Sequence, residues 1–128
     1  MHAVLQQDER LVRFTTICLG FPGAAREIQG MHASFRTKKK TFAYYLNDHH
    51  GDGIVGVWCK VLPGDNSALI KADPGRFYMP AYVGARGWLG LRLDVGRIDW
   101  KEVKEFVRGS YQLVSGRALA VTVDPTAT

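Results

Sequence analysis

The sequence is poor in the features that mark secreted and membrane proteins. Its 128 residues include only two cysteines, Cys18 and Cys59, and no apolar run approaches the length of about 20 residues that crosses a bilayer. Each cysteine lies in an apolar segment, without the close spacing of a redox or zinc pair, so we expect two buried thiols. Residues 1–9 have no basic group ahead of an apolar run, which predicts that they are not a signal peptide. We therefore expect a cytoplasmic protein with no membrane partner.

The sequence also lacks the residue patterns of known catalytic and metal centres. It has no glycine-rich phosphate loop followed by a lysine and a hydroxyl. The segment 48–52 contains two histidines and two aspartates, but its spacing matches no standard zinc pattern. His32 has no visible acidic partner that would complete a hydrolytic triad. We therefore expect a protein that is not an enzyme and that holds no metal and no cofactor.

Positive charge is concentrated in the middle of the chain. The formal net charge is +5, from 17 lysines and arginines against 12 aspartates and glutamates. Residues 1–29 and 98–128 each sum to zero, so the whole excess lies within residues 30–97. A basic region of this kind favours an anionic partner, although many basic proteins are simply soluble.

Hydrophobic periodicity and turn residues predict three helices and five strands. The helices are expected over 8–20, 67–72 and from Asp99 to Gly116, with Asp65 or Asn66 as the N-cap of the second helix. The expected strands are 26–37, 41–46, 54–61, 77–83 and 88–93. Pro80 lies inside the fourth of these, which predicts an edge or a bulged strand.

This element order predicts the fold class. Short turns between consecutive strands force antiparallel pairing and leave the helices on one face of the sheet. We expect an α+β fold, a two-layer α/β sandwich with a five-stranded antiparallel sheet in the order α-β-β-β-α-β-β-α. Residues 1–119 are expected to form a single domain, and residues 120–128 a C-terminal tail with little structure.

Period-two alternation assigns each strand residue to one of two faces. The core face, under the helices, is expected to hold Phe42, Tyr44, Leu46, Val55, Val57, Cys59, Val61, Leu89, Leu91 and Leu93. The opposite face would then hold Arg36, Ala43, Tyr45, Gly56, Trp58, Lys60, Trp88, Gly90 and Arg92. Basic groups among aromatic rings on a sheet can neutralise phosphates and stack on bases. The alternative is that the tryptophans only cover the sheet, with the stems of neighbouring Lys and Arg over them.

The strongest charge feature is the run Lys38-Lys39-Lys40, which follows Arg36 and is expected at the tip of a hairpin. Such a tip could bind phosphates, or it could be a solvated turn. Arg76 and Arg86 lie near the second predicted hairpin. The predicted nucleic-acid-binding residues are Arg36, Lys38, Lys39, Lys40, Lys60, Arg76, Arg86, Trp88 and Arg92, with Tyr45 and Trp58 as stacking candidates.

Several motifs together resemble the MmcQ/YjbR family, over nearly the whole chain from about Leu11 to Leu119. The most specific are Asp73-Pro74-Gly75-Arg76-Phe77-Tyr78, Pro80-Ala81-Tyr82-Val83-Gly84 and Gly87-Trp88-Leu89-Gly90. Further matches are Phe35-Arg36, Lys40-Thr41-Phe42-Ala43, Arg92-Leu93-Asp94, Asp99-Trp100 and Ser110-Tyr111.

The resemblance implies a two-layer α/β fold with a five-stranded antiparallel sheet, related to the CyaY-like (frataxin-like) and secretion-chaperone architectures. The family is labelled DNA-binding because its two hairpins look like a double wing. Here the wings would be the Lys38–Lys40 tip and the Val83–Trp88 turn. The label is an inference from fold, and fold alone does not determine function.

The family offers no agreed catalytic residues, and its shared positions also allow a purely structural reading. In that reading Gly84 and Gly87 serve the turn and Trp88 packs. Arg76 would then pair with Asp73 or Asp94.

Three functions therefore stay open. The first is a non-enzymatic nucleic-acid-binding domain, with DNA as the expected partner. The second is a protein-interaction module, with a partner protein or a second copy of the chain on the open sheet face or an edge strand. The third is an enzyme or small-ligand binder with a pocket near Trp58, Lys60 and Arg92.

Overall fold

The computed structural model describes residues 8–38 and 40–116. Its helices are α2 (Glu9–Leu19), α3 (Asp65–Ala72) and α4 (Trp100–Ser115), and its strands are β1 (Ala24–Gln29), β2 (His32–Thr37), β3 (Lys40–Asn47), β4 (Val55–Lys60), β5 (Phe77–Tyr78) and β6 (Trp88–Arg92). Two 3-10 turns, η1 (His49–Gly51) and η2 (Gly84–Arg86), lie in the connections. Among the described ranges, no helix has the length and apolar character to cross a bilayer. The expected tail, residues 120–128, lies outside them.

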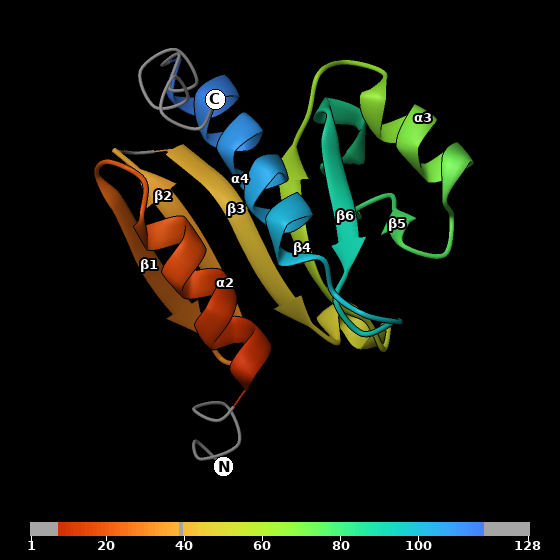
Figure 1. Cartoon of the computed structure of the whole chain (residues 1–128), viewed down its shortest axis with the longest axis horizontal. Helices are drawn as coiled ribbons and strands as arrows, with labels where there is room; N and C mark the ends of the chain where they lie inside the picture. The colour runs from red at the N-terminus through yellow and green to blue at the C-terminus, as the bar shows by residue number, and fades with distance from the viewer. Residues whose placement is uncertain (1–7, 39, 117–128) are drawn as a thin grey trace.

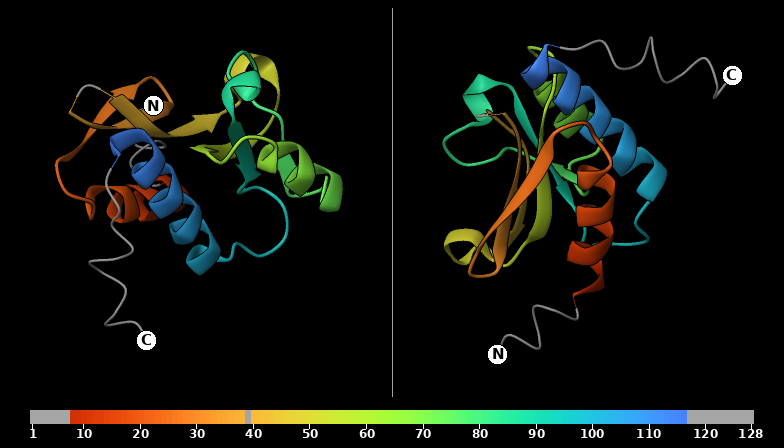
Figure 2. Two further views of the ribbon diagram at one scale, coloured as in Figure 1. Left: turned by 90° about the horizontal axis from the view of Figure 1, so that it is seen from above. Right: turned by 90° about the vertical axis from the view of Figure 1, so that its left-hand side faces the viewer.

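All six strands form one antiparallel sheet in the order β1-β2-β3-β4-β6-β5 (Figure 1). Helices α2 and α4 lie against one face of this sheet, whereas α3 lies beyond its β5 edge (Figures 1 and 2). The expected α+β fold with an antiparallel sheet is confirmed. Both cysteines are buried in the core between helices and sheet, as predicted, and burial raises the pKa of Cys59 to about 12.

The predicted number of strands is wrong, because the segment 26–37 is a hairpin and not one strand. β1 pairs with β2 from Ala24↔Thr37 to Gln29↔His32. The turn between them contains Gly30, whose φ of 60° is accessible to glycine at little cost. Most side chains of β1 are exposed, so they do not alternate between core and solvent. The sequence therefore has no hydrophobic pattern that separates β1 from β2.

A β-bulge in β3 corrects the predicted faces of that strand. Pairing with β2 shifts between Phe35↔Ala43 and Arg36↔Thr41, which leaves Phe42 as an extra residue. Phe42 and Ala43 therefore both belong to the helix-covered core, and Tyr45 joins them. Tyr44 and Leu46 pack on the other face. Period-two alternation from Phe42 had predicted the reverse for the residues that follow it.

Predicted helix ends are confirmed for the two long helices and corrected for the short one. Asp8 and Asp99 cap α2 and α4 by accepting hydrogen bonds from backbone N–H groups, and Gly116 ends α4 in the left-handed conformation. The N-cap of α3 is Gly64, so Asp65 and Asn66 lie inside the helix.

The fourth predicted strand, 77–83, is shorter than expected. β5 ends at Tyr78, two residues before Pro80, and lies at the edge of the sheet as the proline indicated. The described chain then continues through an irregular segment to η2.

Ser110 of α4 connects the helix to the two central strands. Pairing of β3 with β4 runs from Asn47↔Val55 to Ala43↔Cys59, so Phe42 and Lys60 are the next opposed residues. The Ser110 hydroxyl lies between them, donating to Phe42 O at 2.6 Å and accepting from Lys60 N–H at 2.8 Å. It takes the place of a strand-to-strand hydrogen bond. Towards this end β3 and β4 diverge, and α4 crosses in front of them (Figure 1).

We predict that Ser110→Ala destabilises the fold by about 2 kcal/mol or more, because a buried donor and a buried acceptor each lose a partner worth about 1–3 kcal/mol. Urea unfolding followed by circular dichroism measures the change. Ser67→Ala, at an exposed position of α3, is the control and should change the free energy of unfolding by less than about 0.5 kcal/mol. Equal stability of the two variants would contradict the role assigned to Ser110.

Candidate functional site

Two hairpin tips lie at the same end of the sheet. The β2–β3 tip is closed by the pair Thr37↔Lys40. The β4–β6 register places Lys60 beside Trp88, so the segment that enters β6 lies at this end too. Figure 1 shows the two tips on either side of the C-terminal half of α4. The arrangement brings together side chains that are far apart in sequence.

The first tip presents exposed lysines. Lys38 and Lys40 are exposed, and Lys38 adopts a φ of 56°, which is uncommon for a residue with a side chain. Lys39, also predicted to bind nucleic acid, lies outside the described residues. Arg36, two residues before the tip, is 3.7 Å from the carboxylate of Glu27 on β1.

The second tip is held by a buried asparagine. The side-chain amide of Asn66 donates to Gly84 O at 2.9 Å and to Trp88 O at 3.0 Å, and so fixes η2 against α3. Gly87 has a φ of 93°, and a Cβ there would lie 3.2 Å from Val61 O, so the turn requires glycine. Arg86 is exposed on this tip.

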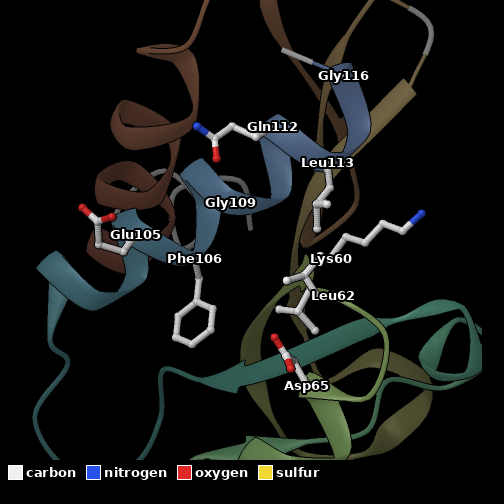
Figure 3. Close-up of a pocket in the computed structure, with 10 residues that line it drawn as sticks. Lys60, Leu62, Asp65, Glu105, Phe106, Gly109, Gln112, Leu113 and Gly116 are labelled. Atoms are coloured by element: carbon white, nitrogen blue, oxygen red, sulfur yellow. The ribbon is translucent and has the colours of Figure 1, made fainter. Parts of the chain in front are cut away.

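Lys60 lies between the two tips, at the junction of two hollows with volumes of about 660 and 720 Å³. The first hollow runs between α4 and the segment after β4, where Phe106, Leu113 and Leu62 give it apolar walls (Figure 3). The second lies under η2 and includes Arg86. Within the described residues, no ion pair involves Lys38, Lys40, Lys60 or Arg86. These four cations define what we call the wing end of the sheet.

Two of the predicted phosphate-binding arginines have structural roles elsewhere. Arg76 contacts the carboxylates of Asp73 at 2.7 Å and Glu102 at 2.6 Å. The hydrogen bonds that Arg76 donates to Glu102 and Asp73 raise its pKa. This confirms the structural reading of Arg76, which joins β5 to α4.

Arg92 is at the far end of β6 from the wing end, opposite Gly56. Its guanidinium pairs with Asp94 at 3.0 Å, and that bond lowers the pKa of Asp94 and raises that of Arg92. Trp58, Lys60 and Arg92, which were expected near one pocket, line three different hollows of the described structure.

The predicted aromatic stacking face is largely covered. Tyr45 is fully buried on the helix side, where its hydroxyl donates to Asp8. Trp58 and Trp88 are only 6% and 8% exposed. The ring of Tyr78 lies over Gly90, where a Cβ would meet it at 2.6 Å, so the protein itself covers the sheet at this glycine. None of these three predicted rings is accessible for stacking on a base.

Comparisons with known proteins place the chain in a family. The family model described as YjbR matches residues 19–113, which is well over half of the chain. The chain belongs to the YjbR family. The resemblance drawn from the sequence motifs is thereby confirmed.

One solved structure supports the fold of this YjbR-family chain. It is the crystal structure of the Deinococcus radiodurans protein DR2400, with the domain DUF419. The two chains are 23% identical, the match covers 82% of this chain and 79% of that one, and the TM-score is 0.64. At this identity the likeness concerns the fold alone. No curated protein matches the chain.

Sequence reasoning missed two features that lie beside the wing end. Asn66 was interpreted as a candidate helix cap. Its side-chain amide instead donates to the carbonyl oxygens of Gly84 and Trp88, which lie 18 and 22 residues further along the chain. Leu62 and Leu113 are exposed apolar residues that line the first hollow. Leu62 directly precedes the turn formers Pro63-Gly64, which is the one sequence signal that could have indicated an exposed apolar residue here.

We predict that Asn66→Asp loosens the second wing in this YjbR-family chain, because a carboxylate cannot donate to Gly84 O and Trp88 O. The expected cost is about 2 kcal/mol, with faster hydrogen exchange at the amides of residues 84–88. Asp65→Asn, at the adjacent exposed position, is the control and should leave that exchange unchanged. Unaltered exchange in Asn66→Asp would refute the assignment.

The Arg92–Asp94 pair predicts a pH effect. Because the pKa of Asp94 is lowered from 3.8, its contribution to stability is complete above about pH 5 and is lost as the pH falls through the lowered pKa. Asp94→Asn should therefore be less stable than the wild type at neutral pH, and the gap should narrow on acidification. Urea unfolding from about pH 2 to pH 7 measures it. A difference in the free energy of unfolding that stays constant across this range would show that the Arg92–Asp94 pair does not stabilise the fold.

Proposed function

We propose that this domain binds DNA through its wing end, without catalysing a reaction. The observation that carries the proposal is the convergence of Lys38, Lys40, Lys60 and Arg86 at one end of the sheet, from three separate segments of the chain. Cations that form no ion pair with the described acidic residues are available to neutralise phosphates. The family's double-wing label agrees with this arrangement but rests on the fold.

The two wings differ in how they would hold a phosphate backbone. The second wing is fixed by Asn66 and the Gly87 turn, so Arg86 projects from a rigid support. The first wing carries its lysines on a hairpin that Ser110 and the Phe42 bulge direct away from β4. Lys60 completes the basic surface between them. Such contacts position a duplex and neutralise charge, and they predict little sequence preference.

The covered tryptophans limit the mode of binding. With Trp58, Trp88 and Tyr45 buried, we infer contacts to the phosphate backbone and not base stacking on these three rings. Affinity would then depend strongly on salt, because each neutralised phosphate releases counterions.

We expect the triple variant Lys38→Ala, Lys40→Ala, Arg86→Ala to bind DNA more weakly and with a shallower salt dependence. The loss in slope should be about 0.9 for each phosphate contact removed. Fluorescence anisotropy of a labelled duplex of about 20 base pairs, titrated at several salt concentrations, measures both quantities.

The matched control removes the same charge elsewhere. Lys71, Lys101 and Lys104 are exposed on the last turn of α3 and the first turns of α4, and their replacement by alanine should leave the salt slope unchanged. If both triple variants lose the same slope, binding is a property of net charge and the wing end is not the site.

A protein-interaction function is the second candidate, and the groove between α4 and the segment after β4 favours it. Leu62 and Leu113 are 56% and 41% exposed there, although they are large apolar residues. Exposed apolar walls next to charged rims are typical of surfaces that bind another protein, including a second copy of the chain. A dimer in sedimentation analysis that Leu62→Asp converts to monomer would favour this function.

A further inference from the structure

A small pocket lies on the sheet face away from the helices, separate from the wing end. Its volume is about 220 Å³, and it shares no lining residue with the two hollows beside Lys60. Its lining comes from β1, β2, β3, η1 and β4, and includes Glu27, His32, Ser34, Tyr44, His49 and Trp58. The β4–β6 part of this face is covered by Tyr78 and Val83, so the pocket occupies the part that the protein leaves accessible.

The pocket walls are flat rings in mutual contact. The ring of His49 lies 5.3 Å from Trp58 and 5.5 Å from His32, and Tyr44 lies 5.6 Å from Trp58, all edge to face. Ring walls of this kind bind planar ligands. The volume is below the range of about 300–1,000 Å³ typical of drug-sized ligands, so it suits a ligand of one or two fused rings.

Polar groups of both kinds surround these rings. Glu27 and Ser34 are direct neighbours across the β1–β2 pair, and each can accept a hydrogen bond, while the serine can also donate. His32 Nδ1 accepts from Asn47 N–H at 3.1 Å, so in the neutral ring the hydrogen is on Nε2, which is a donor. Donors and acceptors together match the edge of a nitrogen heterocycle.

The one carboxylate among the described residues that line the pocket, that of Glu27, has a basic partner. The Glu27 carboxylate is 3.7 Å from the guanidinium of Arg36. Burial, with the neighbouring His50 and His32, lowers the pKa of His49, so its ring is neutral at pH 7. A neutral ligand is therefore favoured over a cation or an anion.

The turn that supplies His49 adopts a strained conformation. Asp48 and His50 on either side of it have φ values of 57° and 54°, which are costly for residues with side chains. The Asp48 carboxylate accepts from Gly53 N–H at 2.7 Å, and Asp48 N–H donates to Ile54 O at 2.8 Å, which holds the turn in place. Strain that is maintained by local hydrogen bonds is common where a side chain is held for binding.

We propose that this pocket binds a single neutral nucleobase, with the ring against His49 and Tyr44 and its polar edge toward Glu27, Ser34 and His32. The inference extends the proposed DNA function, on which it rests for biological meaning, since an unpaired base of a bound strand would be its natural occupant. The base is recognised away from the wing end, so the two sites can be tested separately.

The test is a titration of the ¹⁵N-labelled protein with adenosine and with cytidine, followed by NMR, with ribose 5-phosphate as the control probe. Nucleosides carry no phosphate and so do not engage the wing-end cations. We expect saturable shifts at the amides of His32, Ser34, Tyr44 and His49 with at least one nucleoside, and none of these with ribose 5-phosphate. No saturable shift with either nucleoside, or equal shifts with ribose 5-phosphate, would overturn the proposal.

Substitutions inside and outside the pocket provide a second test. His49→Ala should weaken nucleoside binding about tenfold, the effect typical of losing one stacking ring, whereas Lys101→Ala, at an exposed position of α4, should not. If His49→Ala fails to fold, Ser34→Ala on β2 replaces it and should weaken nucleoside binding several-fold.

The wing-end triple variant should retain nucleoside binding even where it loses DNA binding. Loss of nucleoside binding in that variant, or unchanged affinity in both pocket variants, would refute the site.

Discussion

The Ser110 hydroxyl is the interaction on which the arrangement of this molecule depends. It lies where strand-to-strand pairing of β3 and β4 stops, and it bonds the carbonyl of Phe42 and the amide of Lys60 instead. One helix thereby fixes both central strands. Because β3 and β4 diverge beyond this point, the hairpin tips belong to two separate halves of one sheet. Lys60, the residue that Ser110 holds by its backbone, lies between them.

A second constraint works on the opposite face. The Phe42 bulge directs two neighbouring residues to the helices and turns Tyr44 and Leu46 towards Trp58. The chain after β5 then covers Trp58 and Trp88, and Tyr78 accepts a hydrogen bond from Trp58 Nε1 at 2.9 Å. The face is therefore divided into a covered part and the small pocket walled by His49. Period-two alternation had predicted basic and aromatic residues together on one surface. In the structure the exposed cations lie at the wing end, and the aromatic rings lie in the covered part and around the pocket.

Local signals explain which parts of the fold could be predicted. The start of α4 at Asp99, its end at Gly116 and the unbroken alternation of β4 and β6 each depend on a few neighbouring residues, and these were predicted correctly. The bulge at Phe42 depends on pairing with β2, and no local residue marks it. β1 was merged with β2 because its exposed side chains leave no core pattern.

The candidate site was predictable only in part, for the same reason. Exposed tip cations such as Lys38 and Arg86 follow from turn residues nearby in sequence. Whether an arginine is available depends on partners far along the chain: Arg76 is bound by Glu102, 26 residues away. Arg92, in contrast, pairs with Asp94 only two residues on, which the sequence could have indicated. Buried Asn66 illustrates the same limit, because its partners are visible only after folding.

The wing end is the proposed DNA-binding surface, and mapping the contact by NMR tests this assignment most directly. A short duplex added to the ¹⁵N-labelled protein should first shift the amides of Lys38, Lys40, Lys60 and Arg86. The amides near Arg76 and Arg92, at the other end of the sheet, should stay in place. Shifts centred on Arg76 or Arg92, with the two hairpin tips unperturbed, would contradict the account.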